Sequence, residues 1–337
     1  MPDLPMLETI LAAKLGDDGR TDSRGRGEDA TVNRLEDLSA EITGKEAAVF
    51  MPTGTFANST AIMTCCHAGD KVLVEEEQHI LLTEKFVFEK DYGRLIPVCY
   101  RLDHKHMPDP EEIDRLLSES GSKLVCLENS HNSAGGYCID CSTLEKIRKV
   151  ADKHGAWIHM DGARLFHAAA YLDTTASQLC QYADSVMFCV SKGLGAPIGS
   201  LLCSTEDFCK KARENRKLFG GVMRQAGVAA APAIYALENN IERLREDIEN
   251  ASVIYDMLKG KMKKIGIQEE VQTNIIMLDL SKAGIYAEEF CEIAEKKGLL
   301  MRPFRSLVKV RMVLYKGIPR KDAVRAAEIV LEIDRSL

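Results

Sequence analysis

Short apolar segments alternate with amphipathic segments along most of this chain. The expected strands are rich in β-branched and other apolar residues and cover 47–51, 72–75, 95–98, 124–127, 156–160, 185–190 and 200–203. Between them, apolar residues recur with helical spacing over 31–42, 56–66, 78–88, 110–117 and 143–154. Strands that alternate with such helices indicate parallel βαβ units. The sequence therefore predicts an α/β domain with a mainly parallel sheet and helices on both faces.

The pattern changes after Gly227. A helical run over 228–264 leads to strands at 274–280 and 309–314 and to amphipathic helices at 288–297 and 321–337. Near the start, a short helix at 6–15 precedes a Gly-, Asp- and Arg-rich stretch, 17–27, which we expect to be a mobile loop. We expect three parts: an N-terminal segment and loop over 1–30, a large α/β domain over 31–240 and a smaller α+β domain over 241–337.

Composition narrows the function classes. The 337 residues carry a net charge of -7, which argues against a nucleic-acid or anionic membrane partner. No apolar run approaches the roughly 18 residues of a membrane span, and residues 1–5 do not resemble a secretion signal, so we expect a soluble, cytoplasmic protein. The 11 cysteines are scattered through apolar runs. Cys138 and Cys141 have the spacing of a metal or redox pair, but with no second pair nearby we prefer small, half-buried residues and expect no metal.

One lysine stands between an expected strand and a glycine-rich loop. Ser191 and Lys192 follow the strand at 185–190, and three glycines and a proline lie in the next seven residues. A lysine beside a desolvated site has a lowered pKa, and its neutral amine can condense with a carbonyl group. The alternative is an ordinary surface lysine in a turn, and this segment alone does not separate the two.

Polar residues follow several expected strands, at the edge where open α/β sheets bind ligands. These positions are Thr53–Thr55, His79, Asn129–Asn132, Asp161–Arg164 and Ser191–Lys192. Residues 52–58 run from a strand into a helix, so free amides there could stabilise a phosphate, the alternative being that Thr55 is simply the helix N-cap. Asp161 ends an apolar strand, where a carboxylate needs a cationic partner. That partner is either a protonated pyridine nitrogen or Arg164.

Asp161 and Lys192, on neighbouring strand ends, together resemble the pair found in fold-type-I, aspartate aminotransferase-like enzymes that use pyridoxal 5'-phosphate (PLP). Residues 159–166, 185–200 and 220–227 are similar to the low-specificity L-threonine aldolase and β-eliminating lyase family. Residues 16–18, 27–33 and 128–132 extend the resemblance to nearly the whole chain. The resemblance implies a PLP-dependent transferase fold, type I.

The resemblance also implies how the cofactor is held. Lys192 would bond its aldehyde, Asp161 would pair with its ring nitrogen, and Arg164 would lie near its phenolic oxygen. Gly54 and Thr55 would hold the phosphate. Arg224 would reach the phosphate from a neighbouring subunit. We therefore expect a homo-oligomer, a dimer or a tetramer, with its sites at the subunit interface.

Further residues are assigned to the substrate by the same resemblance. His79 would stack on the cofactor ring and His131 would lie near the substrate hydroxyl, and with Lys192 they form the expected catalytic set. Arg311 would bind the substrate carboxylate, with Arg164 and His131 also contacting the substrate. The strand supports Arg311 independently, because apolar residues alternate onto its other face at Val308, Val310, Met312 and Leu314. The alternative for Arg311 is a solvated charge on an edge strand, with Arg302 and Arg305 as rivals.

The implied reaction is cleavage of L-threonine, L-allo-threonine or another β-hydroxy-α-amino acid to glycine and an aldehyde, with His131 removing the hydroxyl proton. One alternative is β-elimination, or cleavage of phenylserine- or hydroxyaspartate-like substrates. Another is a non-catalytic PLP-binding relative, because residues 1–5 do not match the Asp-Thr-Val-Thr-like strand with which family members begin. The presence of Lys192, Asp161 and Arg164 favours an enzyme.

Overall fold

A large sheet forms the centre of the molecule in the computed structural model, which describes residues 2–23 and 25–337. Seven strands follow the order β1-β7-β6-β5-β4-β2-β3. They are β1 (Ala47–Met51), β2 (Lys71–Glu75), β3 (Ile96–Tyr100), β4 (Leu124–Glu128), β5 (Trp157–Asp161), β6 (Ser185–Cys189) and β7 (Ser200–Ser204). β7 pairs antiparallel with β1 and β6, and the other pairs are parallel. The predicted mainly parallel sheet is confirmed.

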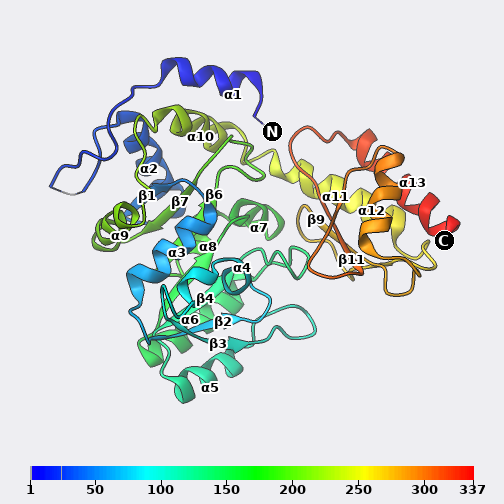
Figure 1. The fold of residues 1–337 in the computed structure, drawn as a ribbon, viewed down its shortest axis with the longest axis horizontal. Helices are drawn as coiled ribbons and strands as arrows, with labels where there is room; N and C mark the ends of the chain where they lie inside the picture. Colours follow the sequence, from blue (N-terminus) through cyan, green and yellow to red (C-terminus); the bar gives the residue numbers. More distant parts are fainter. Residues whose placement is uncertain (1, 24) are drawn as a thin grey trace.

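Helices cover both faces of this sheet (Figure 1). One face packs against α2 (Ala30–Thr43), α5 (Pro110–Ser120), α6 (Cys141–His154), α7 (Leu165–Tyr171), α8 (Ala176–Cys180) and α10 (Gly227–Asn239). The other packs against α3 (Gly54–Cys65), α4 (His79–Thr83) and α9 (Glu206–Leu218). Side chains alternate along a strand, so Val186 and Phe188 of β6 enter the first core, and Met187 and Cys189 enter the second. Buried strands of this kind need apolar residues on both faces.

Local sequence signals set the ends of three helices. α2, α5 and α6 begin after aspartates whose carboxylates accept backbone N–H bonds, at Asp29, Asp109 and Asp140. The same helices end at glycines with φ angles of 66°, 66° and 63°, at Gly44, Gly121 and Gly155. Glycine adopts this left-handed conformation without steric cost.

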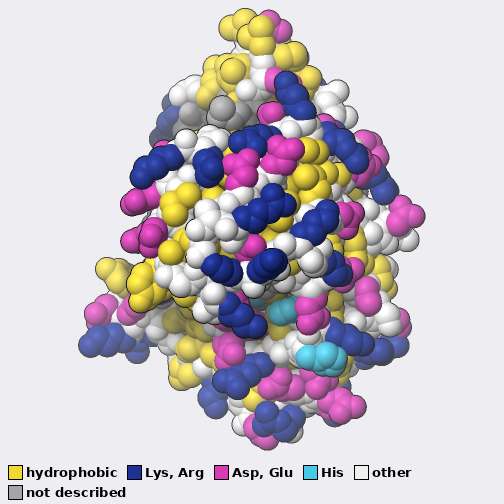
Figure 2. Space-filling model, turned by 90° about the vertical axis from the view of Figure 1, so that its right-hand side faces the viewer, with side chains coloured by type: hydrophobic (Ala, Val, Ile, Leu, Met, Phe, Trp, Pro, Cys, Tyr) yellow, Lys and Arg dark blue, Asp and Glu magenta, His cyan; other side chains and the backbone are white. Residues whose placement is uncertain are grey.

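The C-terminal part is a smaller α+β unit. Its antiparallel sheet has the order β10-β11-β9-β8, formed by β8 (Gly266–Ile267), β9 (Ile275–Asp279), β10 (Arg302–Pro303) and β11 (Lys309–Val313). The helices α11 (Leu244–Leu258), α12 (Ala287–Lys296) and α13 (Arg320–Ser336) share a separate core with it. On the outer side of this unit, Lys and Arg lie interspersed with Asp and Glu (Figure 2). Within the described ranges, no helix is long and apolar enough to cross a membrane.

Three expected helices differ from the observed ones. The prediction of a single helix over 228–264 is wrong, because α10 ends before Asn240 and α11 begins only at Leu244. The side-chain amide of Asn240 donates to the Leu194 carbonyl (2.7 Å) and accepts from Lys316 (3.2 Å). The helix over 78–88 is divided into α4 and a 3-10 turn, η2 (Lys85–Val87). The helix over 6–15 is α1 (Leu4–Glu8) followed by a 3-10 turn, η1 (Thr9–Ala12). The domain boundary at 240/241 stays a prediction.

The stretch expected to be a mobile loop, 17–27, includes Arg24, which lies outside the described residues. On either side of it, isolated β-bridges join Asp17 to Arg224 and Thr21 to Gly27. The N-terminal segment is therefore attached to the turn that precedes α10.

Phe290 of α12 tests the core of the small unit. Its ring is fully buried, so Phe290→Ala would leave a cavity and lower the free energy of unfolding by about 3–5 kcal/mol. Urea denaturation measures this change. Tyr286, just before the same helix, is 61% exposed, and Tyr286→Ala should change stability by less than about 0.5 kcal/mol. Equal losses from the two substitutions would contradict the separate core.

Candidate active site

A cavity of about 240 Å³ lies where β5 and β6 end and α3 begins. Five of the predicted site residues line it: Gly54, Thr55, His79, Asp161 and Lys192. Lys192 is exposed and belongs to the loop after β6. The structure therefore brings the lysine and the aspartate into one cavity at the carboxyl edge of the sheet, where α/β folds bind ligands.

The first turn of α3 faces this cavity. Its N-cap is Thr53, whose hydroxyl accepts from the Phe56 N–H (3.1 Å), so the assignment of Thr55 as N-cap is wrong. The first amides of a helix have no intrahelical partner, and the helix dipole is positive at that end. A Cβ on Gly54 would lie 2.8 Å from Cys189 Sγ and 2.9 Å from Met187 Cε. Glycine is therefore required for this close approach to β6, and the turn can hold an anion.

Asp161 is a carboxylate with 2% exposure at the end of β5. Asn58 Nδ2 donates to Asp161 Oδ2 (2.8 Å), and the Ala163 N–H donates to Oδ1 (3.0 Å). Across residues 2–23 and 25–337, no Lys or Arg forms an ion pair with Asp161, so the structure does not support the alternative salt bridge to Arg164. A buried carboxylate in this position can take a cationic partner from a ligand.

Asn58 is itself oriented from the sheet. His159 Nε2 lies 3.0 Å from Asn58 Oδ1, and His159 Nδ1 lies 2.9 Å from Ser185 Oγ. Burial lowers the pKa of His159 to about 4, so the ring is neutral near pH 7 and its Nε2–H donates to the Asn58 oxygen. The amide NH₂ group is then directed at Asp161. His159 and Asp161 can both meet α3 because they are two positions apart on β5.

His79 is paired with a buried carboxylate. Its Nδ1 lies 3.1 and 3.0 Å from the two carboxylate oxygens of Glu84, a residue with 1% exposure. Burial lowers the pKa of His79, but the hydrogen bond and charge of Glu84 outweigh burial, so the net shift is upward from 6.5. In the part of the chain that the structure describes, His79 Nε2 has no hydrogen-bond partner.

His131 does not line the cavity. Its Nε2 lies 2.9 Å from Glu75 Oε2, and its Nδ1 accepts from the Ala134 N–H (3.1 Å). Burial lowers the pKa of His131, but Glu128 and Glu75 outweigh it and the net shift is upward. Both ring nitrogens of this buried histidine are therefore engaged by the protein.

Arg164 and Arg311 do not line the cavity, although Arg164 follows Ala163, which does. The two arginines meet at one amide oxygen. Arg164 Nη1 and Arg311 Nη1 donate to Asn132 Oδ1 over 3.2 and 2.7 Å. Burial, together with the charges of Arg164 and Arg305, lowers the pKa of Arg311 to about 10. Neither Arg164 nor Arg311 has a carboxylate partner within the described ranges. Paired guanidinium groups without an acidic partner can bind an anion such as a carboxylate.

The position of Arg311 does not fit the alternative of a solvated charge on an edge strand. β11 lies between β10 and β9, so Arg311 is not on an edge strand, and its guanidinium lies 4.3 Å from the centroid of the Phe304 ring. Arg302 is exposed. Arg305 donates to the Glu77 carbonyl (2.9 Å) and to Ser133 Oγ (2.5 Å).

Arg224 does not line the cavity of its own chain. Its side chain is 65% exposed and pairs with Asp17. The expected role of Arg224 in a neighbouring subunit stays a prediction.

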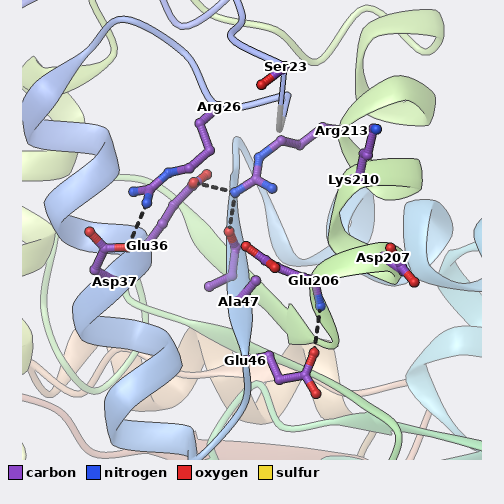
Figure 3. A pocket seen from close by; sticks show the side chains of 11 residues that line it. Ser23, Arg26, Glu36, Asp37, Glu46, Ala47, Glu206, Asp207, Lys210 and Arg213 are labelled. Carbon is purple, nitrogen blue, oxygen red and sulfur yellow. Dashed lines mark hydrogen bonds and ion pairs between the residues drawn. The ribbon is translucent and has the colours of Figure 1, made fainter.

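A second cavity lies near the start of β1, at the opposite end of that strand from the first (Figure 3). Both of its arginines are paired with carboxylates: Arg26 with Asp37 (2.9 Å) and Arg213 with Glu36 (2.5 Å). The Glu46 carboxylate accepts from the Glu206 N–H (3.0 Å). Because these two arginines are already paired with acids, the first cavity is the better candidate site for an anionic ligand.

Sequence reasoning missed Asn58, Glu84 and the bridging role of Asn132. In the continuous helix expected over 78–88, Glu84 would point about 140° away from His79, at roughly 100° per residue. The observed α4 ends at Thr83, and the following turn brings the carboxylate back to the ring. An Asn one turn into α3 carries no sequence signal of its own.

Gly193 lies in the loop that carries Lys192, here called the lysine loop, and a substitution at Gly193 measures how tightly this loop is packed. A Cβ at this position would lie 2.1 Å from His167 Cε1. Gly193→Ala should therefore displace the loop and lower the free energy of unfolding by about 1–3 kcal/mol in urea denaturation. Gly266 on the edge strand β8 is the control, since its nearest contact would be 3.2 Å. A Gly193→Ala protein as stable as Gly266→Ala would show that the loop is not tightly packed.

Comparisons with known proteins agree with this geometry. The model of a family described as β-eliminating lyase matches residues 3–283. The low-specificity L-threonine aldolase of Escherichia coli (strain K12) is 37% identical over 345 residues, covering 97% of this chain and 94% of that protein. Low-specificity L-threonine aldolase 1 of Arabidopsis thaliana is 34% identical over 331 residues, covering 95% and 90%.

The fold is also found among solved structures. A crystal structure of a putative L-allo-threonine aldolase from Listeria monocytogenes matches with a TM-score of 0.79 at 22% identity, covering 98% of this chain and 93% of that one. This likeness confirms the predicted fold, that of the type-I PLP-dependent transferases. Together with the family match and the identities above, it shows that this chain belongs to the β-eliminating lyase family.

Proposed function

We propose that this protein is a PLP-dependent aldolase that cleaves L-threonine and L-allo-threonine to glycine and acetaldehyde. The observation that carries the proposal is the presence of Lys192 and Asp161 in one cavity. The names of the relatives support the substrate class, since they are threonine and allo-threonine aldolases.

The residues of the cavity fit PLP. The first turn of α3 offers free amides to a phosphate, and Asp161 is a buried carboxylate that can pair with a protonated ring nitrogen. The Lys192 amine is exposed in the same cavity and can bond an aldehyde. When bound there, PLP would withdraw electrons from the substrate Cα and so weaken its bonds.

The side chains of this protein would select the bond and move the proton. Arg311 and Arg164 would hold the substrate carboxylate, which fixes the orientation of the other groups on Cα. His79 Nε2 is free to accept the hydroxyl proton. We assign this proton transfer to His79 ahead of His131, because both ring nitrogens of His131 are already hydrogen-bonded.

We also propose a homo-oligomer with Arg224 serving a neighbouring site. An exposed arginine that does not line the cavity of its own chain supports this arrangement. Whether the assembly is a dimer or a tetramer, and its cytoplasmic location, stay predictions.

The central test compares the PLP-loaded wild-type protein with Lys192→Ala. The wild type should release glycine and acetaldehyde in equal amounts from both threonine diastereomers. Lys192→Ala should lose the visible absorbance of the lysine-bound cofactor, and glycine release should fall by roughly 1,000-fold or more. Lys210→Ala, in the second cavity, is the matched control and should keep both.

The rival functions predict other products. Ammonia release from amino acids with a β-leaving group would favour β-elimination. A coloured wild-type protein that turns over no β-hydroxy amino acid would favour the non-catalytic relative, and a Lys192→Ala protein with unchanged absorbance would refute the assignment of the lysine.

Arg311 gives a second test. Arg311→Leu removes charge-assisted hydrogen bonds to the substrate carboxylate, so kcat/KM for L-threonine should fall by about 10–100-fold. Steady-state kinetics measures this change. The exposed Arg302 provides the control, and Arg302→Leu should leave kcat/KM within about twofold. A similar loss in both variants would argue against a specific carboxylate site.

A further inference from the structure

Glu84 is a buried carboxylate that reaches the cavity only through other side chains. Its two oxygens lie 3.1 and 3.0 Å from His79 Nδ1, and its Oε1 lies 3.3 Å from Asn58 Nδ2. The residue is 1% exposed and does not line the cavity. The reaction described above assigns no role to Glu84.

We propose that Glu84 is the positioning residue for His79: it keeps the proton of the neutral ring on Nδ1 and leaves Nε2 as the basic atom that serves the cavity. The consequence for turnover rests on the proposed aldolase function. The assignment of the tautomer does not depend on that function, because the contacts that determine the tautomer are present in the protein without cofactor.

Hydrogen-bond chemistry carries the first step. A neutral imidazole has one N–H donor and one acceptor nitrogen, and an ionised carboxylate can only accept. Burial raises the pKa of Glu84, whereas the hydrogen bonds from His79 and Asn58 lower it, with a net upward shift. With Glu84 ionised, the His79 nitrogen that faces both of its oxygens carries the proton, and Nε2 holds the lone pair. A fixed tautomer of this kind is what a histidine needs to act as a base at one defined atom.

The backbone of His79 is also held. Its N–H donates to Glu128 Oε2 over 2.9 Å, and Glu128 Oε1 accepts from the Asn132 N–H over 2.9 Å. The ring is thus fixed by Glu84 and the backbone by Glu128, the last residue of β4. The Glu128 carboxylate thereby connects the backbone of His79 to Asn132, whose side-chain oxygen accepts from Arg164 and Arg311.

The groups around the ring agree with this assignment. Asn58 Nδ2 donates to both Glu84 and Asp161, so one amide group joins the two carboxylates. Burial lowers the pKa of His79, while Glu84, Asp161 and Glu128 raise it, with a net upward shift. Removing the charge of Glu84 should therefore lower the pKa of His79.

The first measurement needs no change at Glu84. In the cofactor-free protein with ¹⁵N-labelled histidine, NMR correlations between ring nitrogens and carbon-bound protons distinguish the two tautomers, and the His79→Gln variant identifies the signals of His79. We expect the Nδ1–H tautomer above the pKa of His79. An Nε2–H tautomer would overturn the proposal.

The second measurement uses Glu84→Gln. An uncharged amide can donate or accept, so the tautomers of His79 should mix and its pKa should fall. The matched control is Asp114→Asn, which removes a carboxylate from another histidine, His154, at 2.5 Å. His154 precedes β5, at the opposite edge of the sheet from the cavity. Asp114→Asn should change the signals of His154 and leave those of His79 unchanged.

The loaded enzyme provides a third readout. If His79 must be deprotonated to act, kcat/KM for L-threonine rises with pH through its pKa, and Glu84→Gln should move that rise to lower pH. The same substitution should lower kcat by roughly 100-fold, the lower end of what a general base supplies. Glu84→Asp keeps the charge and should keep the rise near its wild-type pH.

The outcomes separate the two proposals. Loss of activity in Glu84→Gln with an unchanged pH profile and unchanged His79 signals would show a merely structural role and overturn the inference. A wild-type enzyme that forms no glycine, while His79 shows the assigned tautomer, would overturn the aldolase function and support the positioning role.

Discussion

The hydrogen bond from the Asn58 amide to Asp161 is the contact on which the site depends. A carboxylate at the end of a buried strand is costly unless its oxygens are satisfied, and here one helix side chain and one backbone amide satisfy them. The same amide is oriented by neutral His159 and shared with Glu84. The sheet, α3 and the His79 segment therefore meet at one polar group, and a change at Asn58 would reach all three.

The small unit contributes to the site in two ways. β11 supplies Arg311, which reaches Asn132 in the segment that follows β4 of the large sheet. The linker to α11 also holds the lysine loop, because Asn240 donates to the Leu194 carbonyl (2.7 Å) and Arg243 to the Gly193 carbonyl (3.2 Å). The break between α10 and α11 thus connects the position of the small unit with the position of Lys192.

Much of the architecture could be predicted from the sequence, since apolar periods of two and 3.6 residues mark strands and helices directly. The cavity residues followed from the rule that ligands lie beyond the carboxyl ends of the strands. The antiparallel direction of β7 and the contact of Glu84 with His79 could not be read this way. The direction of β7 depends on which strands pair, and the contact between Glu84 and His79 depends on where the short helix α4 ends. Asn132 accepts from one arginine that follows the large sheet and from another on the small sheet, so its role appears only after the two sheets pack together.

The two arginines at Asn132 bear on the order in which products leave. Both guanidinium groups donate to the same amide oxygen, and Arg164 follows β5 of the large sheet whereas Arg311 lies on β11 of the small one. Of the two products, glycine carries a carboxylate and acetaldehyde does not. Acetaldehyde would thus leave without giving up a contact to either arginine, whereas glycine would have to give up both guanidinium groups before it could leave.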